Sequence, residues 1–289
     1  MEEKIMMKRN LRLFVVFGLM GACGFDNGQQ SHLKDEIRPC EKKIYGTVDD
    51  RSLKEISGID ASRIYPGTYY VHNDSGDGAY LYRIDKDAKV LSKKKIRGAE
   101  SVDWEDLSVG PCPDGSCVYI ADFGNNNHQR DVFDIYRVPE NSDRGERFRF
   151  RYPDSERHNA EAFAINPKDG SMFVIRKTRQ DTNTLFKFPS LRSDVMTLKK
   201  VCDFTHIGDQ RVTGADIHHD GSSMLIRTYD WVYEFRNREG KTICDSVVRK
   251  MKHYEPQGEA IAYKNNSNDF VTVSEKRGQP LYKFSCSGK

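Results

Sequence analysis

The stretch Leu81-Tyr82-Arg83-Ile84 places an aromatic and a charged residue between two aliphatic residues, and the same four-residue phrase returns four more times along the chain. Each copy follows a run of residues that favour β-strands and precedes polar residues. A repeat of roughly 40–55 residues that carries several short strands is typical of a β-propeller blade. The further copies are Ile135-Tyr136-Arg137-Val138, Leu185-Phe186-Lys187-Phe188, Val232-Tyr233-Glu234-Phe235 and Leu281-Tyr282-Lys283-Phe284.

The other strands of each repeat can be recognised around this phrase. A first strand such as Glu161-Ala162-Phe163 leads into a turn, often Asp-Gly, and then into the most apolar strand. The phrase itself forms the third strand, and a weaker fourth strand follows. The last repeat ends after Phe284, one strand short, and the segment Lys43 to Val48 could supply that strand. We therefore expect an all-β propeller of five blades, with six as the alternative, closed by pairing of the N- and C-terminal strands.

The N-terminal residues resemble an export signal. A basic region is followed by the apolar stretch Leu13 to Met20, which is too short to span a bilayer. Small residues then precede Cys23, as in a bacterial lipobox, although Met20 stands where leucine is usual; an ordinary signal peptide cleaved nearby is the alternative. We expect a signal peptide over 1–22, a lipidated Cys23 with a flexible tether over 23–38, and one propeller domain over 39–289.

The expected location follows from this signal. The domain would lie in the periplasm or outside the cell, and lipid on Cys23 would be its only attachment to the outer membrane or cell surface. The formal net charge is +3 and falls to about +1 without residues 1–22. Such a small charge exerts no long-range attraction on nucleic acid or an anionic membrane. We therefore expect no nucleic-acid partner. We also expect the domain to be a monomer.

The cysteine count agrees with export. If Cys23 carries lipid, six cysteines remain, and an even number in an exported chain predicts disulfides, with free buried thiols as the alternative. Three pairings follow from position: one pair flanks a hairpin turn, one lies near the two ends of the domain, and one occupies similar places in consecutive repeats. These pairs are Cys112 with Cys117, Cys40 with Cys286, and Cys202 with Cys244.

Acidic residues are expected to converge at the central channel of such a ring. Glutamate precedes the apolar residue of the first strand by two positions in three repeats, and carboxylates crowded in a channel either raise their pKa values or bind a cation. Oxygen ligands without clustered cysteine or histidine favour Ca²⁺, and Mg²⁺ less so. Alternatively, each carboxylate binds backbone amides of the next blade. The predicted metal ligands are Glu105, Asp106, Glu161, Asp216 and Glu259.

Basic and polar residues are expected at the same opening, because second strands end on the face where first strands begin. Arginine and lysine beside a metal would suit a phosphate or carboxylate ligand, whereas internal salt bridges are the simpler explanation. The expected partner is an anionic small molecule or another surface protein, and no motif for an organic cofactor is present. The predicted ligand-binding residues are Asn73, Asp74, Asp122, Arg176, Lys177, Arg227, Tyr229 and Glu275.

Several motifs resemble a known family. The residues Asp103-Trp104-Glu105-Asp106-Leu107, Cys117 to Gly124 and Ile135 to Glu140 are similar to secreted bacterial propellers, mostly uncharacterised, that are related to the phytase-like (esterase-like) propellers. The resemblance covers about residues 55–285. The family commonly has aspartate where this chain has Asn125, which weakens the argument for a metal. By analogy of architecture alone, the resemblance implies calcium at the channel mouth and a phosphoester hydrolase.

These observations lead to three functional hypotheses. The first is an anchored propeller that binds a divalent cation and an anionic ligand in its funnel without catalysis. The second is a Ca²⁺-dependent phosphoester or ester hydrolase in which Glu105 or Glu161 acts as base and nearby arginine and lysine hold the anion. The third is an interaction scaffold that uses the rim. We favour the first, because no nucleophile or pair of bases stands out from the spacing.

Overall fold

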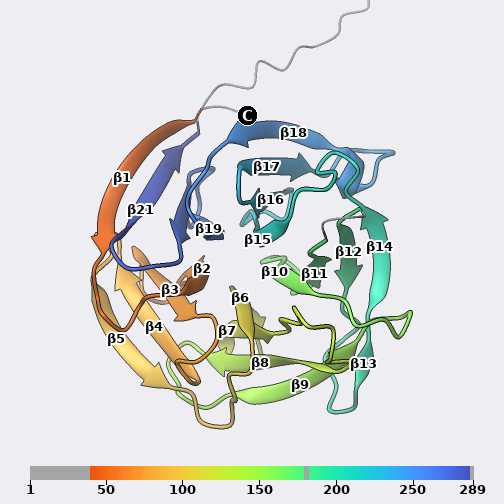
Figure 1. Cartoon of the computed structure of the whole chain (residues 1–289), viewed down its shortest axis with the longest axis horizontal. Helices are drawn as coiled ribbons and strands as arrows, with labels where there is room; N and C mark the ends of the chain where they lie inside the picture. The colour runs from red at the N-terminus through yellow and green to blue at the C-terminus, as the bar shows by residue number, and fades with distance from the viewer. Residues whose placement is uncertain (1–39, 179–181, 287–289) are drawn as a thin grey trace, which may run out of the picture. The chain divides into compact units, whose positions relative to one another are not determined.

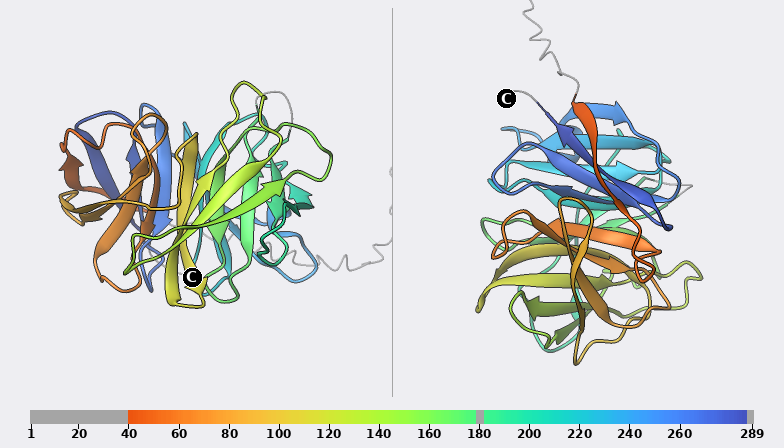
Figure 2. Two further views of the ribbon diagram at one scale, coloured as in Figure 1. Left: turned by 90° about the horizontal axis from the view of Figure 1, so that it is seen from below. Right: turned by 90° about the vertical axis from the view of Figure 1, so that its left-hand side faces the viewer.

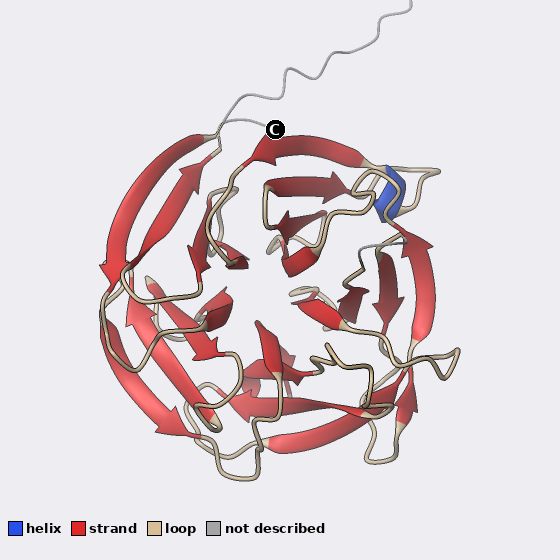
Figure 3. Cartoon of the chain, viewed as in Figure 1, coloured by secondary structure: helices blue, strands red, loops and turns tan. Residues whose placement is uncertain are grey.

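The structure is a computed structural model that describes residues 40–178 and 182–286. The predicted signal peptide, the lipidated Cys23 and the tether over 23–38 lie outside the described residues. Within the described part, no helix is long and apolar enough to cross a membrane. Strands dominate, and one short 3-10 helix, η1 (Ile243–Asp245), lies between the third and fourth strands of one blade (Figure 3).

Five sheets surround a central channel (Figure 1), which confirms the expected propeller of five blades and not six. Each blade has four antiparallel strands that run from the channel outwards, and the sheet of the second blade also carries a short, parallel strand on its outer edge, β13 (Met196–Thr197). From the channel outwards, the first blade consists of β2 (Ile56–Ala61), β3 (Thr68–Asn73), β4 (Tyr80–Asp85) and β5 (Val90–Lys95), and the second of β6 (Trp104–Cys112), β7 (Gly115–Asp122), β8 (Phe133–Pro139) and β9 (Glu146–Arg151). The third blade consists of β10 (Ala160–Ile165), β11 (Met172–Arg176), β12 (Thr184–Lys187) and β14 (Lys199–Asp203), and the fourth of β15 (Val212–Ile217), β16 (Ser223–Thr228), β17 (Trp231–Arg236) and β18 (Val247–Lys252). The fifth blade consists of β19 (Gly258–Tyr263), β20 (Phe270–Ser274), β21 (Gln279–Ser285) and β1 (Glu41–Val48).

The ring closes as the sequence predicts. Strand β1 pairs antiparallel with β21, from Glu41 opposite Ser285 to Val48 opposite Gln279, and so completes the fifth blade. The disulfide between Cys40 and Cys286 lies at the end of this pairing. The other two expected disulfides, Cys112–Cys117 and Cys202–Cys244, are present as well. Three disulfides indicate an oxidising, exported compartment.

Apolar side chains fill the space between neighbouring blades, which pack face to face around the ring (Figure 2). Each of the five interfaces between adjacent blades has its own hydrophobic cluster. The cluster between the second and third blades is aromatic, with Phe150 and Phe188 ring centroids 4.8 Å apart. The first strands β2, β10, β15 and β19 are buried along their whole length, because they are covered on both faces and line a narrow channel.

The repeated phrase has a structural explanation in the pairing of third and fourth strands. Its aromatic residue is buried and lies opposite a basic residue of the fourth strand in four blades. In two of them the lysine amine lies over the ring, 4.9 Å from the centroid of Tyr82 and 5.2 Å from that of Tyr233. The pairs are Tyr82 with Lys93, Tyr136 with Arg147, Phe186 with Lys200, and Tyr233 with Lys250.

Every first strand contains a β-bulge at the same position. The strand register shifts there in all five blades, and a bulge turns the extra side chain out of the regular alternation. The bulged residues are therefore structurally equivalent: Ser57, Glu105, Glu161, Thr213 and Glu259.

Candidate functional site

One mouth of the channel opens into a polar cavity of about 680 Å³, here called the funnel. All five blades contribute to it. It brings together eight of the predicted site residues: Glu105, Glu161, Glu259, Asp74, Arg176, Lys177, Tyr229 and Glu275. The remaining lining residues are Asn126, His128, His158, Asn159, Thr178, Arg211 and Gln257.

Three carboxylates from the first two blades form the tightest group. Asp74, Asp103 and Glu105 each offer an oxygen, and these oxygens lie within 4.8 Å of one another. The Oδ1 atom of Asp74 is buried and has no hydrogen-bond partner among the described residues. A Cβ atom at Gly124 would lie 2.3 Å from oxygens of both Asp103 and Glu105, so only glycine leaves room for them here. The group is thus compact, partly buried and incompletely hydrogen-bonded among the described residues.

Burial and mutual repulsion raise the pKa values of these carboxyl groups. Burial, with the charges of Asp103 and Glu275, raises the pKa of Asp74 to about 8. Burial and the charge of Glu161 raise the pKa values of Glu105 and Glu259 well above their usual range. Neutral pH therefore leaves the funnel with protons on some of its carboxyl groups unless a cation neutralises them.

This shift predicts how stability depends on pH. The pKa of Asp74 is raised on folding, so protonation of Asp74 favours the folded state. Its contribution to the free energy of unfolding is complete below about pH 4 and is lost as the pH rises towards about 8. We therefore expect Asp74→Asn to gain stability relative to the metal-free parent as the pH rises from 5 to 8. Melting curves of both proteins in a chelator would measure the difference. A constant difference between the two proteins across this pH range would contradict the shift.

The opposite side of the funnel carries the positive charge. The amine of Lys177 is ion-paired with Glu161 and lies 3.3 Å from the hydroxyl of Tyr229, which donates to Glu259 at 3.2 Å. The guanidinium of Arg211 lies 4.5 Å from the centroid of the Tyr229 ring. The second oxygen of Glu161, Oε2, is buried without a hydrogen-bond partner in the described part of the chain. The third and fourth blades therefore place basic and aromatic groups opposite the carboxylates of the first two.

Asp106 does not line the funnel, so its prediction as a metal ligand is wrong. Its carboxylate accepts backbone N–H bonds from Leu107 (2.8 Å), from Phe163 in the third blade (2.9 Å) and from Ala215 in the fourth (3.4 Å). It thus lies inside the channel and ties three blades together. The carboxylate of Asp106 therefore binds backbone amides of neighbouring blades, which was the alternative to a metal ligand.

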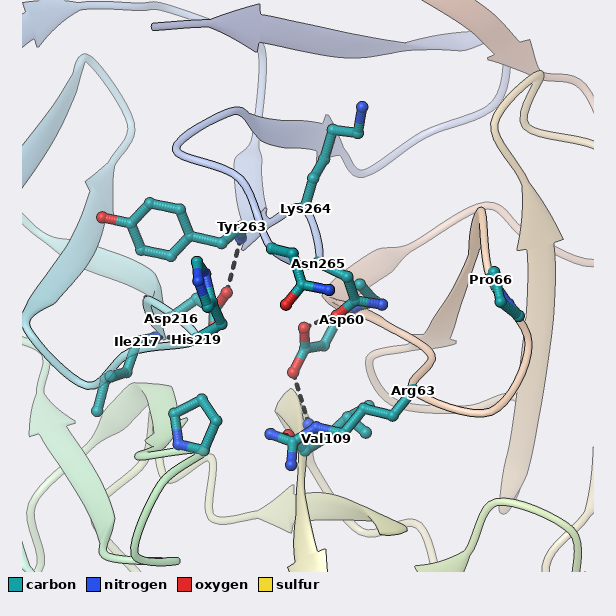
Figure 4. Close-up of a pocket in the computed structure, with 13 residues that line it drawn as sticks. Asp60, Arg63, Pro66, Val109, Asp216, Ile217, His219, Tyr263, Lys264 and Asn265 are labelled. Carbon is teal, nitrogen blue, oxygen red and sulfur yellow. Dashed lines mark hydrogen bonds between the residues drawn. The ribbon is translucent and has the colours of Figure 1, made fainter. Parts of the chain in front are cut away.

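Asp216 belongs to the other mouth of the channel (Figure 4), so it is not a ligand in the funnel. It lines a separate cavity of about 420 Å³ together with Asp60. Its carboxylate accepts the N–H groups of Ile217 (2.7 Å) and of Tyr263 in the next blade (2.6 Å). The residue of this blade that is equivalent to Glu105 is Thr213, and Asp216 follows it three positions later along the strand, towards the other mouth.

Three predicted ligand-binding residues are structural instead. Arg227 is fully buried and ion-paired with Glu255, and Asp122 is fully buried and ion-paired with Arg130 at 2.8 Å. The side-chain oxygen of Asn73 accepts two backbone N–H groups, each at 3.2 Å. Asn73 and Asp122 are the last residues of their second strands and Arg227 is the last but one. Side chains alternate between the two faces of a strand, so a place near the strand end does not by itself direct a side chain into the channel. The residue after the strand lines the funnel instead in four blades, as Asp74, Lys177, Tyr229 and Glu275.

A regular position in the sequence could have revealed some of the missed residues. Asp103, Asn159 and Gln257 each stand two residues before the bulged glutamate. Their backbone carbonyls accept N–H groups from the segments that follow the second strands, at 2.9–3.1 Å. Asn125 holds its own loop by accepting the N–H groups of Gln129 and Arg130 at 2.9 Å. His128, His158 and Arg211 lie on loops without such a pattern.

Comparisons with known proteins show no family for this chain. No protein-family model matches the sequence, and no curated protein matches it. Among solved structures, the chain is similar to the β-propeller domain of Cps50 (Swd1) from Myceliophteria thermophila, with 11% identity over 86% of this chain and 100% of that one, at a TM-score of 0.47. A gluconolactonase from Xanthomonas campestris, XC5397, has 12% identity over 86% of this chain and 95% of that one, at a TM-score of 0.48. These likenesses are to other propellers, and neither identifies a ligand.

Proposed function

We propose that this chain is an exported propeller whose funnel binds a divalent cation, Ca²⁺ in preference to Mg²⁺, and an anionic ligand beside it. The observation that carries the proposal is the group of Asp74, Asp103 and Glu105, which converges on one point and leaves a buried oxygen without a partner. Burying several carboxylates without a counter-charge is costly, and a divalent cation would remove that cost.

The donor set favours a hard cation. The converging atoms are carboxylate oxygens alone, and Ca²⁺ accepts six to eight oxygens in flexible geometry, whereas Mg²⁺ demands a near-ideal octahedron. Asp74, Asp103 and Glu105 would hold the cation, and Glu275 and Glu259 line the same funnel. No cysteine lines the funnel, which argues against the softer metals that thiolates select.

The anionic ligand would lie between this cation and the basic side of the funnel. Lys177 and Arg211 flank Tyr229, which keeps two positive charges on the third and fourth blades. A phosphate or carboxylate group could bind to these two positively charged side chains. Arg227 plays no part in this proposal, because its guanidinium is buried between the fourth and fifth blades.

A hydrolase of phosphate or other esters is the second candidate, and Glu161 is the observation that favours it. One oxygen of Glu161 is ion-paired with Lys177, while the other is buried in the funnel wall and has no hydrogen-bond partner among residues 40–178 and 182–286. A carboxylate held in this way is placed to accept a proton from water beside a bound ester. Lys177 and Arg211 would hold the anionic part of that ester.

Calcium titration of the purified protein tests the proposal. We expect Ca²⁺ to bind and to raise the melting temperature, because a ligand that binds only the folded state stabilises it. Asp74→Asn and Glu105→Gln should each weaken binding by about tenfold or more, since each removes a charged ligand. Asp60→Asn is the matched control, because this buried carboxyl group lies at the other mouth.

The outcomes separate the hypotheses. Absence of binding by Ca²⁺, Mg²⁺ and Mn²⁺ would make the carboxylate group structural and direct attention to protein partners at the rim. If Ca²⁺ binds, turnover of phosphate and carboxyl esters that is lost in Glu161→Gln, with calcium binding kept, would establish the hydrolase. Binding without turnover of either ester class would support the module that binds without catalysis.

A further inference from the structure

The outer edges of the first three blades carry a continuous stretch of basic residues, here called the basic belt. It consists of residues 90–97, 143–151 and 196–203. Ten basic side chains lie in it against three acidic ones, although the whole chain has a net charge of only +3. The basic members are Lys93, Lys94, Lys95, Arg97, Arg144, Arg147, Arg149, Arg151, Lys199 and Lys200; the acidic ones are Asp143, Glu146 and Asp203.

Backbone hydrogen bonds join the belt from blade to blade. The N–H of Arg97 donates to Asp143 at 2.8 Å, and the N–H of Gly145 donates back to Arg97 at 2.8 Å, which links the first blade to the second. The short strand β13 (Met196–Thr197) pairs parallel with β9 and leads into β14, which links the second blade to the third. The belt is therefore one ordered edge, as the perimeter in Figure 1 shows.

Most of its charge is not neutralised internally. Arg97, Arg147 and Lys200 are ion-paired at 2.7–2.8 Å with Asp143, Asp134 and Asp203. Among residues 40–178 and 182–286, the other seven make no ion pair, and all but the half-buried Lys94 are exposed. Those seven are Lys93, Lys94, Lys95, Arg144, Arg149, Arg151 and Lys199.

Protection of the sheet edges explains only part of this pattern. Lysine on an outer strand prevents edge-to-edge aggregation, but glutamate would protect an edge as well. The outer strands of the other two blades have the same excess, with Arg249, Lys250 and Lys252 on β18 and Lys42 and Lys43 on β1 against Glu41. An excess of positive charge on every outer edge indicates a partner of negative charge.

We propose that the basic belt binds a linear acidic polysaccharide that follows the convex perimeter of the ring. A flat membrane could touch only a small arc of such an edge, whereas a flexible chain can follow it across three blades. Single-stranded nucleic acid is held by exposed aromatic platforms, and the aromatic residues of the belt, Phe148 and Phe150, are buried. The carboxylate or sulfate groups of the polymer would pair with the unneutralised lysine and arginine side chains. This inference does not depend on the function of the funnel.

Binding to alginate, a linear polyuronate, tests the belt. The variant Lys93→Glu/Lys95→Glu/Arg149→Glu/Arg151→Glu reverses four exposed charges that have no ion-pair partner in the described part of the chain. The control Arg51→Glu/Lys54→Glu/Lys168→Glu/Lys241→Glu makes the same change in net charge at exposed positions outside the belt. Both variants should keep their melting temperatures, because surface substitutions of this kind change stability little.

We expect the parent protein to bind alginate and not neutral dextran, with affinity that falls as salt rises. The belt variant should lose affinity by about tenfold or more, and the control by much less. Equal losses in both variants would show that only net charge matters and would overturn the proposal. So would the absence of alginate binding at low salt, or equally tight binding of duplex DNA at the same concentration of charge.

Discussion

Replacing Arg227 with methionine is expected to lower the free energy of unfolding by about 3–5 kcal/mol, because one partner of a buried ion pair is lost while the other remains. Arg227 is fully buried, pairs with Glu255 and donates to the carbonyl oxygens of Ala260 (2.9 Å) and Val273 (3.2 Å). Denaturant unfolding of the two proteins measures the loss. Arg236→Met, which removes a partly exposed ion pair on β17, should cost less than about 1 kcal/mol.

The environment of Glu255 explains the size of this effect. Burial raises the pKa of Glu255, but the charge of Arg227 and the donors His253 and Thr272 outweigh burial and lower it to about 2. Because this pKa is lowered on folding, the pair stabilises the protein above about pH 4.5, and the stability is lost as the pH falls towards 2. Adding Glu255→Gln to Arg227→Met should therefore recover part of the loss. A double variant no more stable than Arg227→Met would count against the buried charge as its cause.

Removing the disulfide between Cys40 and Cys286 is expected to have an effect at least as large. These residues are 246 positions apart, whereas Cys112 and Cys117 are 5 apart. Chain entropy in the unfolded state predicts a loss of about 5.5 kcal/mol for the long loop and about 2 kcal/mol for the short one. The variants Cys40→Ala/Cys286→Ala and Cys112→Ala/Cys117→Ala form a matched pair for denaturant unfolding. Equal losses would show that the terminal bridge constrains the chain no more than a hairpin does.

The fold was predictable because every repeat carries the same local pattern. The phrase at Tyr82 and its four copies fixed the third strands, and the strand missing after Phe284 pointed to the N-terminal segment. Glu105, Glu161 and Glu259 were found for the same reason, since they occupy one equivalent bulge in three blades.

The errors arose where one repeat departs from the common sequence pattern, or where that pattern does not show which way a side chain points. The fourth blade has Thr213 at the bulge and an aspartate three residues later, so Asp216 was placed at the wrong mouth. Arg227 lies in the strand Ser223–Thr228, whose six residues are all buried, so alternation of polar and apolar residues could not show which way it points. Burial from both sides removes the signal that distinguishes a channel residue from a core residue.

The pairing of β1 with β21 also has a consequence for the order of synthesis. The first strand of the domain to be made finds its partner only when residues 279–285 have emerged. Until then the hydrogen-bonding groups of β1 are unpaired, and the fifth blade lacks its third strand. Contacts that join the two ends of a chain form late and slowly. The ring therefore closes only after β21 has been made, and the disulfide between Cys40 and Cys286 can form only after that.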